Sequence, residues 1–321
     1  MSSDSPRTVA ELLGEDAPKN WGKWGPDDEV GALNYLTPAE ALRGVAAIKS
    51  GESFTLQVPI GQPGVPDLVH PTRTPAVRTS VSDEGFFQRG AEAPPTGHHY
   101  ADDKIEMFLQ GSTQTDALGH LWYGGQIWNG YDAATTDGEL RKASILPLAE
   151  RGVVGHGVLI DMARYYGKDN LEHGQAFSHV EMLDAARAQG VEIRPRDIIL
   201  LRTGWLGYYY RATREEFFAE WNEPGLTWSR ELVDWFQRME IPNLVTDLVA
   251  NEATYHPGSG VEIPLHNALM RNLGVVFTEI VWLDDLAAAC AADNRWDFLY
   301  TAAPLKVYGA SGAPVNPIAI R

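Results

Sequence analysis

The sequence contains a single cysteine, Cys290, and no long apolar run. One thiol cannot form an internal disulfide, and a zinc site built from cysteines is also excluded. This cysteine usage is typical of a reducing compartment, so we expect a cytoplasmic protein. No segment approaches the roughly 20 apolar residues of a membrane span, and the first residues lack the apolar stretch of a signal peptide. We therefore expect no membrane partner.

Basic residues are also scarce, with 26 Lys and Arg against 43 Asp and Glu, which gives a formal net charge of -17. A chain this acidic is a poor partner for the phosphate backbone of a nucleic acid or for an anionic membrane surface. The acidic residues are scattered along the chain, as on an ordinary solvated surface. The hydrophobic content of 44% is sufficient for a sizeable core, so one large domain is expected.

Several sequence patterns for catalysis or nucleotide binding are missing as well. No G-x-S-x-G nucleophile elbow occurs. The glycines of "GVVGHGV" are not followed by a phosphate-binding helix, so this segment is interpreted as the entry to a strand. Cys290 lies in an Ala-rich, predicted helical setting without a nearby histidine, which argues against a reactive thiol. No internal repeat or linker divides the chain.

Helix signals and strand-length apolar runs alternate along the second half of the sequence. Capping boxes predict helices from Thr37 to a stop at Gly51 and from Ser178 to a stop at Gly190, and a third helix starts near Thr227. Apolar runs rich in β-branched residues predict strands at 157–163, 197–205, 242–250 and 274–283. This alternation indicates an α/β protein with buried, partly parallel strands. Residues 62–100, rich in Pro, Gly, Thr and Ser, are predicted to form long surface loops.

The segment "FLQGSTQTDALGH" holds the first candidate site residues. In an extended segment Gln114 and Asp116 share one face, and His120 follows four residues after the aspartate. A carboxylate beside an imidazole can bind a divalent metal, or act as a base with its orienting partner. The alternative is a surface aspartate and a half-buried histidine satisfied by hydrogen bonds. His98 and His99 could approach the same site through the long loop.

A second group of candidates lies far downstream. His266 begins a predicted helix, and Glu279 lies in the apolar strand "VVFTEIVWL", where an unpaired charge is costly. Asp247 in "NLVTDLVA" raises the same problem, with Glu252 just beyond it, although Asp247 could cap or brace a neighbouring loop. Buried strand carboxylates are more often structural than catalytic, but two of them with two histidines favour a site.

Several segments together resemble the cyclase superfamily that includes bacterial kynurenine formamidase, isatin hydrolase and trans-dienelactone hydrolase. "QGSTQTDALGH" matches its H-x-G-T-H-x-D-x-P-x-H signature without gaps. Asp116 and His120 match the aspartate and the last histidine, whereas Gln110 and Gln114 replace the first two histidines and Leu118 replaces the proline. The resemblance extends over most of the chain from about residue 21, through "WGPDDEVGALNYLTP", "GHGVLIDMA", "VEIRPRDIILLRTGW", "PLHNALMRNLGV" and "TEIVWLDDL".

This resemblance implies a swivelling β/β/α domain, which has a mixed sheet with flanking helices and forms a homodimer or higher homo-oligomer. We therefore expect one domain over residues 1–321, with an N-terminal arm at about 1–36 and a loop excursion at about 62–100. Members of the superfamily hydrolyse amide, cyclic amide or lactone bonds of small molecules with one or two divalent ions, zinc or manganese.

The resemblance also implies a set of ligands. Carried over residue by residue, the first ion position becomes Gln110, Gln114 and Asp116, and the second becomes Asp116, His120, His266 and Glu279. Because a carboxamide oxygen is neutral and weakly donating, the two glutamines should greatly weaken binding of zinc at the first position, while manganese tolerates oxygen better. The second position keeps all of its ligands.

Three functions remain open from the sequence. The first is a metal-dependent hydrolase of an amide, imide or lactone, in which one ion at the second position lowers the pKa of a water and presents hydroxide to a carbonyl. Gln110 and Gln114 would then be weak ligands or donors to the substrate. The second is a metal-independent cyclase or dehydratase, in which Asp116 orients His120 for proton transfer within the same four-residue cluster. The third is a relative that binds a small molecule without catalysis.

Overall fold

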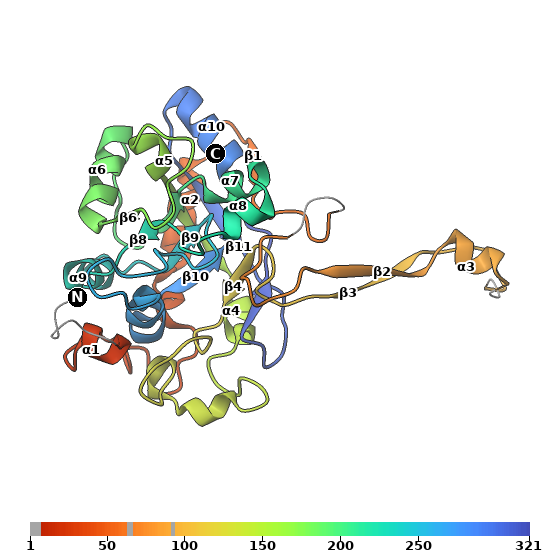
Figure 1. Cartoon of the computed structure of the whole chain (residues 1–321), viewed down its shortest axis with the longest axis horizontal. Helices are drawn as coiled ribbons and strands as arrows, with labels where there is room; N and C mark the ends of the chain where they lie inside the picture. The colour runs from red at the N-terminus through yellow and green to blue at the C-terminus, as the bar shows by residue number, and fades with distance from the viewer. Residues whose placement is uncertain (1–7, 63–66, 91–93) are drawn as a thin grey trace.

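A mixed β-sheet forms the centre of the molecule (Figure 1). The structure is a computed structural model that describes residues 8–62, 67–90 and 94–321. Within these residues the sheet has nine strands. In spatial order they are β1 (Ser53–Thr55), β13 (Ile318–Ile320), β11 (Asp297–Ala302), β5 (Val153–Asp161), β7 (Ile198–Arg202), β9 (Asn243–Thr246), β10 (Val276–Glu279), β4 (Gln114–Asp116) and β12 (Gly312–Pro314).

The middle of the sheet is parallel and the flanks are antiparallel. Strands β5, β7, β9 and β10 run parallel to one another, and they correspond to the four strands that the apolar runs predict. β4 pairs antiparallel with both β10 and β12, and β11 pairs antiparallel with β5 and β13. A mixed sheet with flanking helices confirms the predicted α/β fold class.

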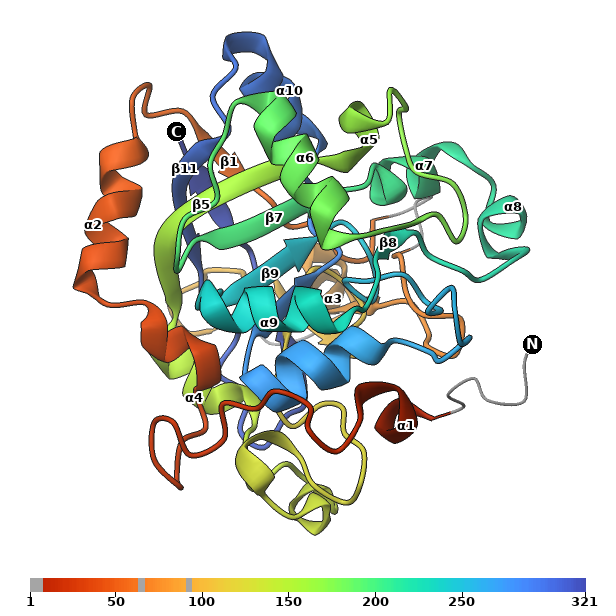
Figure 2. The same ribbon diagram turned by 90° about the vertical axis from the view of Figure 1, so that its left-hand side faces the viewer.

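Helices cover the sheet. Figure 2 shows α6 and α9 lying across the face of β5, β7 and β9 that is turned to the viewer. Helix α2 packs on β5 and β11, and its Gly44 permits this approach because a Cβ there would lie 2.6 Å from the carbonyl oxygen of Gly155. Every helix in the described part of the chain is too short or too polar to cross a membrane. The α-helices of the main body are α1 (Val9–Leu13), α2 (Pro38–Ala47), α4 (Ile145–Arg151), α5 (Met162–Tyr165), α6 (His179–Gln189), α7 (Trp205–Arg211), α8 (Arg214–Phe218), α9 (Arg230–Arg238) and α10 (Asp284–Asp293).

Shorter elements connect these. The 3-10 turns are η1 (Gly31–Tyr35), η2 (Trp128–Gly130) and η3 (Ala133–Thr136), and η4 (His266–Arg271) is a π-helix. Strands β6 (Ala176–Phe177) and β8 (Gly225–Leu226) pair parallel as a separate two-stranded ribbon.

The local helix signals are confirmed at most helix starts and wrong at one helix end. Both predicted capping boxes are present, at the first turns of α2 and α6, and Gly190 closes α6 in the left-handed conformation. α2, however, ends at Ala47 and not at Gly51, because the backbone N–H groups of Ser50 and Gly51 donate to the carbonyl oxygen of Arg321 and turn the chain toward β1. The third helix, α9, begins at Arg230, with Ser229 as its N-cap.

The hydrophobic core has two parts. The larger part lies between the sheet and its helices and includes the fully buried Phe277, Phe298 and Tyr300. The smaller part lies under α7 and α8, where Trp205 and Phe217 pack together in an aromatic cluster. Buried rings of the aromatic segment after residue 205 thus form part of the core.

A long arm projects from the body (Figure 1). It consists of β2 (Val77–Ser82) and β3 (Asp102–Glu106), which pair antiparallel, with α3 (Glu84–Gln88) near its outer end. All of β3 and nearly all of β2 are exposed. Part of the range 62–100, which the sequence predicts as surface loops, is therefore a β-hairpin and a short helix. Both sides of the hairpin face solvent, so it lacks the alternation of apolar and polar residues that marks a half-buried strand.

Candidate metal centre

The site is built around two neighbouring strands, β4 and β10. Gln114 of β4 lies directly opposite Glu279 of β10 in the antiparallel register, and its Nε2 donates a 2.5 Å hydrogen bond to Glu279 Oε2. Because side chains alternate along a strand, Asp116 lies on the same face as Gln114. All three side chains are buried. Strand pairing therefore brings together residues that are about 165 positions apart in the sequence.

His266 enters the same space from the start of the π-helix η4. Its imidazole is fixed by Glu252, whose Oε1 accepts hydrogen bonds from the backbone N (2.8 Å) and from Nδ1 (2.7 Å) of His266. Glu252 Oε2 also accepts from the backbone N of Leu265 at 2.7 Å. With the ring held in this way, its other nitrogen, Nε2, lies 3.4 Å from Glu279 Oε1 and 3.8 Å from Asp116 Oδ2. π-Helical turns are rare and occur frequently at functional sites.

His120 completes the group at its solvent-facing side. The chain turns after β4, with the backbone N of His120 donating to the carbonyl oxygen of Ala117. This turn places His120 Nε2 3.8 Å from Asp116 Oδ1, with 23% of the side chain exposed. The predicted four-residue spacing between Asp116 and His120 is thus realised as a tight turn that brings the two side chains together.

Several oxygens of this cluster lack hydrogen-bond partners. Asp116 Oδ1 and Oδ2, Glu279 Oε1 and Gln114 Oε1 are buried and accept no hydrogen bond from any described residue. A buried polar atom without a hydrogen-bond partner destabilises a folded protein by about 1–3 kcal/mol, and a charged one by more. One ligand atom each from Asp116, His266 and Glu279 lies within 4.8 Å of the others. Two carboxylates and an imidazole converging with free lone pairs are a suitable donor set for a divalent cation.

The electrostatics of the cluster are those of excess negative charge. Burial and the neighbouring Asp116 raise the pKa of Glu279, and burial raises the pKa of Glu252. Burial opposes a charge on His266, but its hydrogen bond to Glu252 and the nearby carboxylate of Glu279 outweigh this effect and raise its pKa. Burial lowers the pKa of His120, although Asp116 acts in the opposite direction, so this imidazole is neutral at pH 7. Three buried carboxylates therefore require compensation by a cation or by protons.

Backbone strain accompanies the site. Ile280, immediately after Glu279, has a φ of 55°, and Ile263, three residues before His266, has a φ of 36°. A left-handed backbone is uncommon for a β-branched residue and costs about 1–3 kcal/mol. At Ile280 the strain is held by two hydrogen bonds, from its backbone N to Leu248 O and from Thr113 Oγ1 to its carbonyl oxygen. Strain of this kind clusters at functional sites, and here it fixes the direction of Glu279.

Other candidates from the sequence lie outside this cluster. Gln110 turns away from it, donating from Nε2 to Ser311 Oγ at 3.0 Å. Asp247 caps the turn before α7, accepting from the backbone N–H groups of Thr203 and Gly204. The two histidines of the long loop are exposed on the arm, where His99 stacks on Phe87 and contacts Glu84 of α3, so neither approaches the site.

The cluster opens into a pocket that contains about 480 Å³ of empty space, including its mouth. His120, His266 and Glu279 form its inner end. The outer walls come from segments that are far apart in the sequence: His70, Arg73, Leu121, Trp221, Val249, Ala250, Thr254, Glu262 and Ile263. This pocket gives a small molecule direct access to the site.

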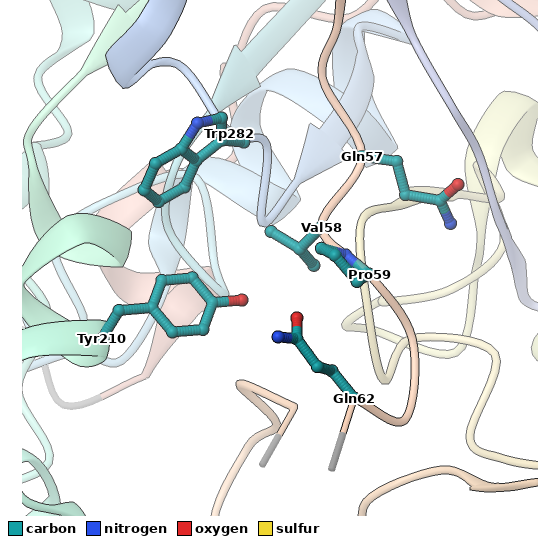
Figure 3. A pocket seen from close by; sticks show the side chains of 6 residues that line it. All are labelled: Gln57, Val58, Pro59, Gln62, Tyr210 and Trp282. Carbon is teal, nitrogen blue, oxygen red and sulfur yellow. The ribbon is translucent and has the colours of Figure 1, made fainter. Parts of the chain in front are cut away.

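A second hollow contains about 590 Å³ of empty space by the same measure (Figure 3). Tyr210 and Trp282 form one side, with their ring centroids 5.7 Å apart, and Val58 and Pro59 form the other. Its lining, as far as the described residues show it, includes no carboxylate and no histidine. We therefore assign the chemistry to the pocket at His120, His266 and Glu279, although this second hollow is larger.

Comparison with known proteins identifies the family. The family model described as "Putative cyclase" matches residues 54–253. A solved structure described as a novel cyclase is 33% identical, with a TM-score of 0.85, covering 95% of this chain and 98% of its own. The chain belongs to the cyclase family. The resemblance noted in the sequence is thereby confirmed.

More distant structures share the cyclase fold. Isatin hydrolase A from Labrenzia aggregata, bound to benzyl benzoate, is 18% identical with a TM-score of 0.56, covering 90% of this chain and 98% of that chain. A predicted metal-dependent hydrolase from Bacillus stearothermophilus is 17% identical with a TM-score of 0.50, covering 84% and 97%. No curated protein sequence matches the chain.

Some residues of this cyclase site were not identified from the sequence. Glu252 was noticed only as a carboxylate near Asp247, and its role as the hydrogen-bond partner of His266 depends on a loop that brings together residues 14 positions apart. Arg73 and Trp221 line the pocket without any local sequence signal. Arg73 lies in the Pro- and Thr-rich loop, where only its charge could have drawn attention.

Proposed function

We propose that this cyclase is a metal-dependent hydrolase of a small-molecule amide, imide or lactone bond, with one divalent ion, manganese or zinc, held by Asp116, His120, His266 and Glu279. The observation that supports it is the set of unsatisfied oxygens on Asp116 and Glu279, which converge with His266 Nε2 within 4.8 Å. His120 Nε2, 3.8 Å from Asp116 Oδ1, is close enough to join with a small movement of its side chain.

The donor set suits such an ion. Two carboxylates offset its charge, and an imidazole adds the nitrogen ligand that zinc and manganese accept. Gln114 Nε2 donates a hydrogen bond to Glu279 Oε2, which leaves Glu279 Oε1 as the oxygen available to the ion. A bound divalent ion would lower the pKa of a water and polarise the substrate carbonyl.

The chain's own residues would position the ligands and limit access of water. Glu252 fixes the ring of His266, as a hydrogen-bonded carboxylate does for many metal-ligating histidines. His120 is neutral and faces the pocket, so the lone pair of its Nε2 atom would be available to the ion. The apolar side chains of Leu121 and Val249 limit access of bulk water to the inner end.

Metal content and metal affinity test this proposal directly. Protein purified without added metal is analysed for its elements, stripped with EDTA and titrated with Mn²⁺ by calorimetry. We expect one site per chain that is lost in Asp116→Asn and in Glu279→Gln. The matched control is Asp103→Asn, because Asp103 lies exposed on the arm and pairs only with Arg78 among described residues.

Activity is followed by acid release from a panel of amides, imides and lactones, with Mn²⁺ removed and restored. The metal proposal fails if EDTA-treated protein keeps its full activity and binds no ion. If Asp116→Asn and His120→Ala leave the biological role intact, the chain is instead a non-catalytic binding protein.

A metal-independent cyclase or dehydratase is the second candidate. It is supported by the hydrogen bond from Gln114 to Glu279 and by the raised pKa of His266, because an amide donor and a protonated imidazole would offset the negative charge of the cluster without an ion. Replacement of Gln110 and Gln114 together by His separates the two candidates. A metal hydrolase should gain metal affinity and keep its activity, whereas a metal-free enzyme should gain metal binding and lose activity.

A further inference from the structure

Arg73 occupies an unusual position at the mouth of the site pocket. It lies on a turn in which its backbone N donates to the carbonyl oxygen of His70 at 2.8 Å, and Thr72 bonds the His70 ring nitrogen Nδ1. The surrounding loop is closed by Asp67, whose carboxylate accepts from the backbone N–H groups of Gly61 and Ala76. Arg73 is therefore presented by a braced turn.

The guanidinium of Arg73 lacks an anionic partner. Among the described residues no carboxylate lies within 4 Å of it, although acidic residues outnumber basic ones 43 to 26 in this chain. Within the part of the chain that the structure describes, its hydrogen bond runs from Nη1 to the carbonyl oxygen of Gln110 at 3.0 Å. Since a guanidinium has five N–H donors in a planar fork, most of its donors remain available.

The position of Arg73 relative to the centre is fixed by its neighbours. Gln110, which accepts its hydrogen bond, lies six residues before Asp116. Arg73, His120 and Glu279 line the same pocket. The cation thus lines the same pocket as the candidate ligands and is not one of them.

One wall beside Arg73 carries flat, uncharged groups. Trp221 meets the ring of His70 edge to face, with centroids 5.6 Å apart, and Leu121 lies on the same pocket. Burial, and then the charge of Arg73, lower the pKa of His70, so its imidazole is neutral at pH 7. Glu262 is the acidic residue of the outer wall, and it is exposed at the rim, where water screens its charge.

We propose that Arg73 binds a carboxylate group of the substrate, so that this enzyme acts on small anionic molecules whose flat part rests against Trp221. A half-buried guanidinium without a partner is a suitable receptor for a planar carboxylate, which it can bind through two parallel hydrogen bonds. The inference rests on the proposed function only for the nature of the scissile bond. Recognition of the carboxylate depends on Arg73 and the pocket alone.

A matched pair of probes tests the inference without knowledge of the substrate. Benzoate and benzamide have the same ring and nearly the same shape and differ in charge. Their dissociation constants are measured by saturation-transfer NMR on the full chain, once after EDTA treatment and once with excess Mn²⁺. We expect benzoate to bind about tenfold more tightly than benzamide, which is the scale of one good charge-assisted contact.

Three variants assign this preference to a residue. Arg73→Gln keeps a donor for Gln110 O but removes the charge, and it should abolish the preference for benzoate. Arg73→Lys keeps the charge without the planar fork and should retain part of it. Arg89→Gln, on the exposed outer end of the arm, is the control and should behave as the unmodified protein. Thermal unfolding of each variant verifies that it is folded.

The outcomes separate this inference from the proposed function. A preference that persists in Arg73→Gln, or that is absent from the unmodified protein, overturns it. A preference that requires Mn²⁺ and is indifferent to Arg73 assigns anion binding to the ion, which overturns the inference and leaves the hydrolase proposal standing. An Arg73-dependent preference in a protein that binds no Mn²⁺ supports the inference, while the metal-dependent hydrolase fails.

Discussion

Glu252 provides the sharpest test of how the site is positioned. Its two carboxylate oxygens accept three hydrogen bonds of 2.7 to 2.8 Å, from the backbone N of Leu265 and from the backbone N and Nδ1 of His266. In Glu252→Gln one oxygen becomes an NH₂ group that must face an N–H donor. At least one of the three bonds is therefore lost, and the remaining ones lose the assistance of a full charge.

The magnitude follows from that geometry. Glu252 is fully buried, and a buried hydrogen bond to a charged group contributes about 1.5–3 kcal/mol. We expect Glu252→Gln to lower the free energy of unfolding by roughly 2 kcal/mol, a fall in Tm of about 4 °C or more for a large domain at 2–4 °C per kcal/mol. Because the carboxylate also orients His266, Mn²⁺ affinity should fall about 10–100-fold.

Calorimetric titration with Mn²⁺ and thermal unfolding measure the two effects on the same sample. Glu172→Gln is the matched control, since Glu172 forms an exposed ion pair with Lys168 and should change Tm by less than about 1 °C. The reasoning is refuted if Glu252→Gln binds Mn²⁺ as tightly as the unmodified protein while Tm falls, because the bonds would then stabilise the fold without positioning the ligand.

Three further predictions concern regions away from the site. Although burial opposes its charge, hydrogen bonds to Asp197 and Asp297 raise the pKa of His156 to about 9. This contribution to stability is present in full below pH 6.5 and is lost as the pH rises through 9, so urea unfolding should show the gap between unmodified protein and His156→Gln shrinking over that range. Cys290 is buried with its pKa raised to about 12 by burial, so a thiol reagent at pH 8 should label it only after unfolding. We further propose that the exposed strands β2 and β3 mediate the homo-oligomer expected from the family resemblance, because a two-stranded ribbon is marginal without a covering surface. Replacing residues 77–106 by a short turn should then give monomers in light scattering, and a mass per particle that still corresponds to several chains would contradict this.

The elements that could be predicted from the sequence are those set by neighbouring residues. The capping boxes at Thr37 and Ser178 predict the starts of α2 and α6 because the bonds involved join residues three positions apart. The four buried strands are marked by continuous β-branched runs. The predicted stop at Gly51 is wrong because Arg321, at the other end of the chain, binds the segment after Ala47, and no local signal reports such a partner.

The candidate site also divides into features set by neighbouring residues, which the sequence predicts, and long-range contacts, which it does not. Alternation along a strand predicts that Gln114 and Asp116 share a face, and the family resemblance links them to His266 and Glu279. The hydrogen bond between Gln114 and Glu279, the grip of Glu252 on His266 and the presence of Arg73 in the pocket all depend on the three-dimensional fold. These contacts join segments without a fixed spacing, so the sequence alone contains no pattern from which to read them.

The most direct test of the central claim is anomalous diffraction from crystals of the full chain grown with MnCl₂ and measured near the manganese edge. We predict a single strong peak per chain between the carboxylates of Asp116 and Glu279 and the Nε2 atom of His266, with His120 Nε2 turned toward it. A map without a peak there, at a Mn²⁺ concentration that saturates binding in calorimetry, would contradict a metal-dependent site. The same conclusion follows if the map lacks the peak and calorimetry detects no binding.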